Sequence, residues 1–274
     1  MPPKIGTLDI ETAPNLIYAW GIHEQEAIRV KRNWYILGFA YKWLNEKKVQ
    51  SHYICDYKDG LKQQDDKVLM QDLWNFLDEA DIVIAHYGSG FDIPKIKARL
   101  MHHGFPPPSP FKVIDTKRAL DGFGFDSKKL ESMGYELKNI GHKSDAGGFA
   151  TWEGCMEGDK KAFAHMRKYN IQDVVVDEKL YLVIRPWMTN HPNLSSYTLE
   201  DGCPKCGGKH NHRRGFSPTP NGQKQRLQCQ DCGGWWSVGP TEKIKRNPNE
   251  VQVQSRRHST AKRGASSSRG SNRV

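Results

Sequence analysis

The stretch Thr7-Leu8-Asp9-Ile10-Glu11-Thr12, close to the N-terminus, alternates apolar and acidic side chains. In an extended strand, side chains two positions apart point to the same face, so Leu8 and Ile10 enter the core while Asp9 and Glu11 share the other face. Mg²⁺ and Mn²⁺ bind oxygen ligands, and paired carboxylates are their usual protein ligands at phosphoryl-transfer sites. An isolated Asp-x-Glu is more often a solvated strand edge, so the metal interpretation depends on acids further along the chain.

The rest of the first 190 residues alternates between strand and helix patterns. We expect strands at 5–10, about 35–43, about 49–55, 82–85 and 111–114, and helices from 66 to about 77, from 93 to about 103 and from about 159 to 184. The second and third strands are expected to be antiparallel neighbours. These elements predict a strand-led α/β domain that ends near Trp187.

Two further acids and a tyrosine follow these elements. Asp92 comes after the strand at 82–85 through a Gly-rich turn, which places its carboxylate at the start of the next helix. Tyr169 and Asp173 are four residues apart, so they share one helical face. Alone, Asp92 is equally well explained as a helix N-cap, and the Tyr-Asp pair as a surface pair. Together with Asp9 and Glu11, in this order, they form a constellation.

That constellation resembles the DEDD exonuclease superfamily over residues 4–187. The resemblance implies a ribonuclease H-like α/β fold, with a mixed sheet flanked by helices. The first motif matches as Asp9-Ile10-Glu11, the second as Phe91-Asp92 and the third as Tyr169-x-x-x-Asp173. The tyrosine in the third motif indicates the tyrosine-bearing branch. The sister branch has a His five residues before the last Asp, where this chain has Lys168.

The match departs from the pattern after His86, where many relatives carry an Asn and this chain has Tyr87. This departure bears on substrate positioning more than on metal binding. Asp115 recurs in such proteins as an acid close to the site, and a helix cap for the residues that follow is the alternative role.

The resemblance implies hydrolysis of a phosphodiester bond from a 3′ end, assisted by two Mg²⁺ or Mn²⁺ ions. It implies that Asp9 bridges both ions, that Glu11 and Asp173 complete one site, and that Asp92 supports the other. Tyr169 would orient the attacking water. Because a phenol has an unperturbed pKa of about 10, orientation is a better role for it than deprotonation.

The six cysteines include two Cys-x-x-Cys pairs. Cys203-Pro204-Lys205-Cys206-Gly207-Gly208 is repeated in type by Cys229-Gln230-Asp231-Cys232-Gly233-Gly234, with 22 residues between the inner cysteines. Each pair and its following glycines form a tight turn, called a knuckle below. Two knuckles supply four thiolates for one tetrahedral structural Zn²⁺. Two disulfides and an iron site are the alternatives. Cys55 and Cys155 lack partners by spacing, so we expect them to be packing residues.

The segment 198–240 resembles a zinc ribbon, a fold too small to hold a core without its metal. Basic groups attract phosphate and aromatic rings stack on unpaired bases, so we expect nucleic acid to contact this segment. The candidates are the loop residues Lys209, His210, His212, Arg213 and Arg214, and the pair Trp235-Trp236 after the second knuckle. Packing of the small ribbon is the alternative role for at least one tryptophan.

The net charge of +10 is unevenly distributed. Residues 1–190 contain 26 Lys and Arg against 26 Asp and Glu, whereas residues 191–274 contain 15 against 5. Residues 241–274 are rich in Lys, Arg, Ser, Asn and Gly, which predicts a disordered basic tail. This asymmetry indicates a neutral catalytic body joined to a cationic module for a polyanion, and nucleic acid fits better than a membrane surface.

With 37% hydrophobic and 26% charged residues, the chain can form one sizeable core and a small appendage. No run of about 18 apolar residues is present, so we expect a protein of the cytoplasm, or of the host-cell cytoplasm if the chain is viral. The sequence thus predicts a metal-dependent 3′→5′ exonuclease of DNA, or of RNA, with a polymerase or another replication protein as a candidate partner. The alternative is a catalytically silent nucleic-acid-binding adaptor of a replication or repair complex.

Overall fold

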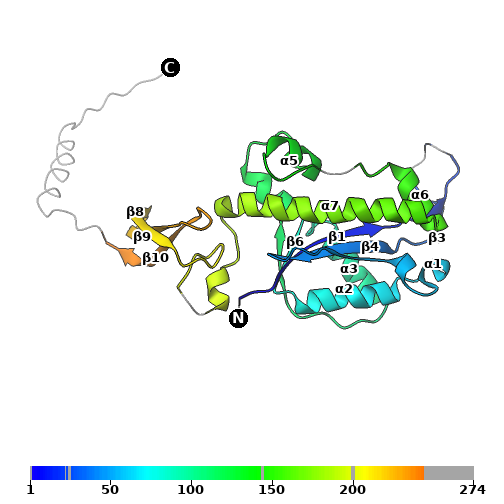
Figure 1. Ribbon diagram of the computed structural model, residues 1–274, viewed down its shortest axis with the longest axis horizontal. Helices are drawn as coiled ribbons and strands as arrows, with labels where there is room; N and C mark the ends of the chain where they lie inside the picture. The colour runs from blue at the N-terminus through cyan, green and yellow to red at the C-terminus, as the bar shows by residue number, and fades with distance from the viewer. Residues whose placement is uncertain (1, 22, 24–25, 143–144, 199–200, 244–274) are drawn as a thin grey trace, which may run out of the picture. The chain divides into compact units, whose positions relative to one another are not determined.

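The centre of the structure is a five-stranded mixed sheet (Figure 1). The computed structural model describes the whole chain except residues 1, 22, 24–25, 143–144, 199–200 and 244–274. The strands of the sheet are β1 (Ile5–Thr12), β4 (Ile36–Trp43), β5 (Gln50–Tyr53), β6 (Ile82–Ala85) and β7 (Lys112–Asp115), in the order β5-β4-β1-β6-β7. β1 pairs antiparallel with β4 and parallel with β6, which confirms the predicted mixed sheet. The carboxyl ends of β1, β6 and β7 therefore meet at one edge.

Helices cover both faces of this sheet (Figure 1). The long helix α7 (Lys160–Ile184) lies across one face, and α2 (Lys67–Glu79) and α3 (Asp92–His102) cover the other. The shorter helices are α1 (Gly60–Gln63), α4 (Thr116–Ala119), α5 (Leu130–Glu136) and α6 (Phe149–Glu157), with 3₁₀ turns at Ile54–Asp56, Leu120–Gly122, Arg185–Trp187 and Leu194–Tyr197.

The apolar patterns of the sequence explain how these helices pack. On α2, the expected stripe is buried, with Leu69, Leu73 and Leu77 each about 1% exposed or less. They pack in the same cluster as Leu8 and Ile10 of β1, so both predicted inward residues of the first strand lie in the core. On α7, the Asp159 side chain accepts a hydrogen bond from the Lys161 backbone N–H at 2.8 Å and caps the helix where the sequence predicts its start.

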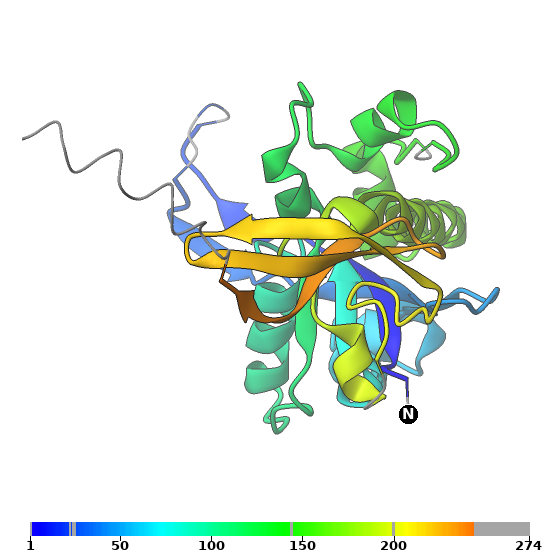
Figure 2. The same cartoon turned by 90° about the vertical axis from the view of Figure 1, so that its left-hand side faces the viewer.

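The C-terminal part contains a three-stranded sheet, drawn in yellow and orange in Figure 2. Its strands are β8 (Asn211–Thr219), β9 (Gly222–Cys229) and β10 (Trp235–Glu242), in the order β10-β9-β8. Arg213 and Arg214, expected in a loop, lie in β8, because the segment between the knuckles forms a hairpin. β10 runs to Glu242, so the first residues of the expected tail 241–274 are in a strand, and residues 244–274 lie outside the described part of the chain.

The chain divides into two compact units, residues 1–212 with 228–236 and residues 213–227 with 237–274. Both cysteine pairs fall in the first unit. The domain boundaries expected from the sequence, at 1–190, 198–240 and 241–274, remain predictions.

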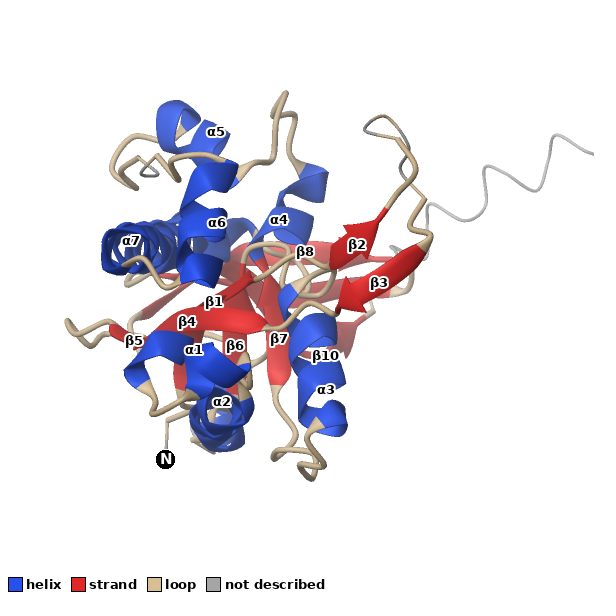
Figure 3. Cartoon of the chain, turned by 90° about the vertical axis from the view of Figure 1, so that its right-hand side faces the viewer, coloured by secondary structure: helices blue, strands red, loops and turns tan. Residues whose placement is uncertain are grey.

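A two-stranded hairpin between β1 and β4 was not expected from the sequence. It is formed by β2 (Leu16–Tyr18) and β3 (Arg29–Arg32), which are labelled in Figure 3. Its apolar residues are exposed, and Tyr18, for example, is 52% accessible. Since neither of its faces enters a core, the hairpin lacks the clean alternation of buried and exposed residues that identifies strands in a sequence.

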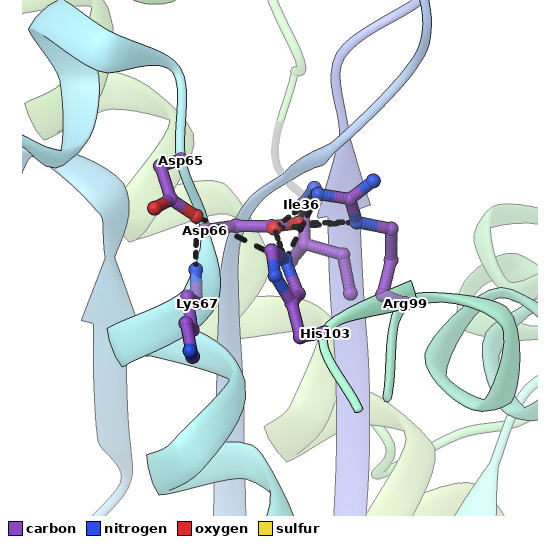
Figure 4. A network of polar contacts seen from close by, with 6 residues as sticks. All are labelled: Ile36, Asp65, Asp66, Lys67, Arg99 and His103. Atoms are coloured by element: carbon purple, nitrogen blue, oxygen red, sulfur yellow. Dashed lines mark hydrogen bonds and ion pairs between the residues drawn. The ribbon is translucent and has the colours of Figure 1, made fainter. Parts of the chain in front are cut away.

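A buried polar network joins three elements on the face covered by α2 and α3 (Figure 4). The Asp66 side chain is fully buried just before α2. It accepts hydrogen bonds from the Ile36 backbone N–H at 2.8 Å and from Arg99 Nε at 2.9 Å, and its Oδ1 lies 2.5 Å from His103 Nε2. The start of β4 and the end of α3 are thereby fixed to the start of α2.

Candidate functional site

The first and second predicted motifs meet at the carboxyl edge of the sheet. Asp9 is half-buried and Glu11 is 8% exposed, both near the end of β1. The Ile10 backbone N–H, between them, donates a hydrogen bond to Asp92 Oδ1 at 3.2 Å. Asp92 is the first residue of α3, as the Gly-rich turn before it predicts. This bond connects residues 82 positions apart in the chain and fixes the Asp92 carboxyl group against the acidic strand.

The third motif reaches the same place from α7. The Asn170 side-chain amide donates to Asp9 Oδ2 at 2.5 Å and to the Asp9 backbone oxygen at 3.2 Å. A cavity of about 430 Å³ lies here. Its lining includes Asp9, Tyr169 and Asp173, together with His86, Lys117, Lys129, Leu130, Glu131, Asp145 and Ala146. The structure therefore brings three of the five predicted catalytic residues to one cavity. Glu11 is buried on the same strand as Asp9, and Asp92 is buried at the start of α3, where it accepts a hydrogen bond from that strand.

Carboxyl groups are concentrated in the buried floor of the site. Burial, with a contribution from Asp115, outweighs the backbone hydrogen bonds that favour the carboxylate and raises the pKa of Asp92 to about 7. Burial also raises the pKa of Asp177 to about 7, and the charges of Asp92, Asp115 and Asp173 add to the shift despite a hydrogen bond from Thr116. Carboxyl groups crowded in this way offer a set of hard oxygen ligands, and a divalent cation would offset their repulsion. The residues present therefore fit a Mg²⁺ or Mn²⁺ site.

Asp115, at the end of β7, supports the turn before Asp92. Its carboxylate accepts hydrogen bonds from the backbone N–H groups of Tyr87 at 3.1 Å and Ser89 at 3.0 Å. It also caps α4 by accepting from the Arg118 N–H at 3.1 Å, which is the cap role that the sequence left open. Tyr87 has a left-handed backbone (φ 67°), and its ring lies under the Lys117 ammonium group at 4.1 Å. The residue that replaces the Asn of many relatives is thus held in a strained turn beside the cavity.

Besides Asn170, sequence reasoning missed two polar residues in the floor of the site, Asp177 and Thr116. Thr116 Oγ1 donates to Asp177 Oδ1 at 2.5 Å and lies 2.9 Å from His86 Nδ1. The other nitrogen of His86 contacts the Lys128 backbone oxygen at 2.9 Å. Asp177 was detectable, because it follows Asp173 by four residues and so shares its helical face. Thr116 carries no such signal, since it reaches the site only through the pairing of β6 with β7.

The four paired cysteines converge on one point, as the sequence predicts. Their sulfur atoms all lie within 4.8 Å of one another, and two of the Sγ–Sγ distances are 3.7 Å (Cys203–Cys232) and 3.6 Å (Cys206–Cys229). Sulfurs about 2.3 Å from a central Zn²⁺ lie about 3.8 Å apart at the corners of a tetrahedron, whereas a disulfide is about 2.05 Å long. The geometry fits a tetrahedral metal site and excludes disulfides among the four.

Both knuckles have the same backbone geometry. The Gly208 and Gly234 N–H groups each point at a cysteine sulfur at 3.4 Å, Cys206 Sγ and Cys232 Sγ respectively. Burial, partly opposed by the backbone N–H groups of Lys205 and Cys206, raises the pKa of Cys203 to about 11. A thiolate at this position therefore needs a bound cation.

The residues predicted to bind nucleic acid differ in exposure. In the first unit, Lys209 is exposed, Trp235 is 43% exposed and Trp236 is half-buried. In the second unit, Arg213 and Arg214 are exposed on β8.

The two cysteines without partners also differ. Cys155 is fully buried in the main core, as expected for a packing residue. The same prediction for Cys55 is wrong, because Cys55 is exposed. It lies in the 3₁₀ turn after β5, a position that spacing in the sequence does not reveal.

Residues 23–184 match the RNase_H superfamily. The chain belongs to this superfamily. The resemblance to a ribonuclease H-like, DEDD-type protein is thereby confirmed, and membership of the RNase_H superfamily supports nuclease activity in general and the binding of nucleic acid. No curated protein matches the sequence.

Among solved structures, the fold is similar to the family B DNA polymerase from the hyperthermophilic archaeon Pyrobaculum calidifontis. The two share 13% sequence identity, with a TM-score of 0.51 over 81% of this chain and 32% of the polymerase chain. This RNase_H-superfamily chain thus corresponds to about a third of that polymerase, and the likeness shows the fold alone. No described helix is long and apolar enough to cross a membrane.

Proposed function

We propose that this protein is a metal-dependent 3′→5′ exonuclease that hydrolyses phosphodiester bonds of DNA, with RNA as the alternative substrate. The cavity lined by Asp9, Tyr169 and Asp173 carries this proposal. These residues come from the first and third motifs, and the Ile10 N–H bond brings Asp92 of the second motif to the same strand. The polarity of cleavage rests on the resemblance to the tyrosine-bearing branch of DEDD exonucleases.

Within this site, the carboxylates of Asp9, Glu11, Asp92 and Asp173 would hold two Mg²⁺ or Mn²⁺ ions. Such ions make a bound water nucleophilic and stabilise the leaving oxygen. Asn170 holds the Asp9 carboxylate through its hydrogen bond at 2.5 Å, so that the ligand keeps one orientation. Tyr169 lines the cavity and would orient the attacking water by hydrogen bonding.

We further propose that Cys203, Cys206, Cys229 and Cys232 hold one structural Zn²⁺. Thiolates favour Zn²⁺ over the hard cations proposed for the carboxylates, and the sulfur separations match its tetrahedral geometry. The basic and aromatic residues after the knuckles, and the basic tail, would add affinity for the nucleic-acid strand. A polymerase or another replication protein remains a predicted partner.

The test is incubation of purified protein with 5′-labelled single- and double-stranded DNA and RNA, with Mg²⁺ or Mn²⁺. We expect a ladder that shortens progressively from the 3′ end. Asp9→Ala should abolish it without unfolding the protein, while Asp121→Asn, which changes an exposed acid outside the cavity, should leave it intact. Binding of DNA without any release of nucleotides would refute the proposal in favour of a silent adaptor, and retention of full activity by Asp9→Ala would refute the assignment of the site.

A further inference from the structure

A second cavity, of about 400 Å³, opens between the end of the β2–β3 hairpin, the end of α1 and the outer part of α3. It shares no lining residue with the candidate active site. Its lining includes two arginines, Arg32 and Arg99, and the amide side chains of Asn33, Gln63 and Gln64. No acidic residue is among the lining residues of this cavity. The cavity is therefore rich in hydrogen-bond donors and positive charge, which is the chemistry that binds an anion.

Two buried donors at this cavity lack partners within the described residues. Tyr35 is 2% exposed, yet its hydroxyl group makes no hydrogen bond there. The Nε of Arg32 is also buried and unpaired in the described part of the chain. The one hydrogen bond found there for the Arg32 guanidinium runs from Nη2 to the Met156 sulfur at 3.8 Å, and a thioether is a weak acceptor. Buried donors of this kind are costly unless a further group satisfies them.

Arg99 contributes from the opposite wall. It directs Nε and Nη2 at Asp66, and Figure 4 shows its remaining nitrogen pointing away from that carboxylate. The Asp66 network thus fixes the guanidinium in place and leaves one of its edges for another ligand.

We propose that this cavity binds a phosphate group of the nucleic-acid strand, with Arg32, Arg99 and the Tyr35 hydroxyl as its donors. The proposal rests on the nuclease function proposed above. Arg99 lies seven residues after Asp92 on α3, which separates the two sites by roughly 10 Å along the helix axis. A strand with its 3′ end at the carboxylates can therefore place a phosphate further along its backbone in the second cavity. A free phosphate or nucleotide has the same chemistry and is distinguished by experiment.

The test measures binding by the full chain in an Asp9→Ala background, which holds the strand without requiring cleavage. The probe is a short fluorescent single-stranded oligonucleotide, titrated by anisotropy between about 50 and 200 mM salt. Arg32→Gln should weaken binding about tenfold, as expected for loss of a charged hydrogen bond. It should also flatten the dependence of log affinity on log salt by about 0.7, the value for one phosphate contact.

Tyr35→Phe provides a second variant that leaves the charge unchanged. It removes only the unpaired hydroxyl, so the fold should be retained and the melting temperature should not fall. We expect about threefold weaker binding with an unchanged salt slope, because no ionic contact is lost. Lys47→Gln, which removes an exposed charge in the turn between β4 and β5, is the matched control and should bind like the parent.

Inorganic phosphate and a nucleoside monophosphate separate the two sources of the anion. If either raises the melting temperature of the wild-type protein but not of Arg32→Gln, while strand binding is equal in both, the cavity is a phosphate site for a free ligand. If Arg32→Gln and Tyr35→Phe match Lys47→Gln with every probe, the site does not exist. Failure of the nuclease proposal is seen separately, as absence of cleavage by the wild-type chain, and does not affect these binding measurements.

Discussion

Replacing Asp66 by Asn should strongly destabilise the protein, because it leaves a buried cation without its counter-charge. The Asp66 carboxylate is fully buried and holds Arg99, His103 and the Ile36 N–H together. Asn keeps the shape but presents an amide N–H₂ group to the guanidinium. Breaking a buried ion pair by removing one partner costs about 3–5 kcal/mol. For a chain of this size, the loss corresponds to a decrease in melting temperature of about 10 °C.

Asp65→Asn is the matched control. The side chain of Asp65 is 47% exposed and accepts a hydrogen bond from the Lys67 N–H at 2.9 Å, which Asn can also accept. Its free energy of unfolding should change by less than about 0.5 kcal/mol. The assay is urea denaturation at neutral pH, followed by circular dichroism. Equal stability of the two variants would refute the reasoning, since it would mean that the buried network contributes no more than a surface acid.

The pH dependence provides an independent check on the same group. Burial by itself raises the pKa of Asp66, but the hydrogen bonds from Arg99, Ile36 and His103 outweigh it, and the pKa is lowered. The unfolded chain therefore binds the proton more readily than the folded one. The stability that Asp66 contributes is fully present above its pKa in the unfolded chain, about 3.9. It is lost as the pH falls through the lower pKa of the folded protein. The difference in free energy of unfolding between wild type and Asp66→Asn should therefore decrease below pH 4. A difference that stays constant with pH would contradict this assignment.

Four further predictions follow from the other parts of the chain. Tyr169→Phe should lower the rate of nucleotide release about tenfold, because it removes a water-orienting group and leaves the metal ligands in place. Asp173→Ala should lower that rate far more, and equal losses of rate in a single-turnover assay would contradict this. Cys203→Ser should release the bound metal, as measured by elemental analysis, and leave the helical signal of the five-stranded domain in place; wild-type protein purified without zinc would contradict it. Residues 244–274 carry eight Lys or Arg and one Glu, and removing them should weaken the binding of long oligonucleotides and flatten the dependence of log affinity on log salt. An unchanged slope of that dependence would mean that the tail does not contact the strand. Burial, with the nearby charges of Arg185 and Lys205 and against a hydrogen bond to Pro192, lowers the pKa of His191 to about 4. The stability of wild type relative to His191→Gln should therefore fall by about 2 kcal/mol between pH 6.5 and 4, and a constant difference in urea denaturation would contradict this.

Local patterns in the sequence were enough to predict the framework of the fold. Apolar residues repeat at the spacing of a helix in α2 and in the helix at 160–184, and they form a continuous run in the strand at 82–85. Such patterns are visible over a few residues, because the buried face of an element recurs with its geometry. The cysteine knuckles are local in the same sense, since each pair and its glycine form one turn. The acidic motifs could be proposed from the order of the residues along the chain, which resembles the DEDD exonucleases.

Contacts between distant residues were decided by the tertiary structure alone. Asn170 holds Asp9 across 161 positions of sequence, and Thr116 reaches Asp177 across 61. The burial of the Tyr35 hydroxyl, the buried Asp66 network and the exposed β2–β3 hairpin likewise cannot be recognised from any periodic pattern in the sequence. The periodic pattern of apolar residues indicates which face of a helix or strand is buried. Which side chain contacts which across two elements depends instead on how those elements pack. The sequence therefore determined most of the secondary structure of the five-stranded domain and the candidate ligands, and packing determined which groups orient those ligands and where the proposed anion site lies.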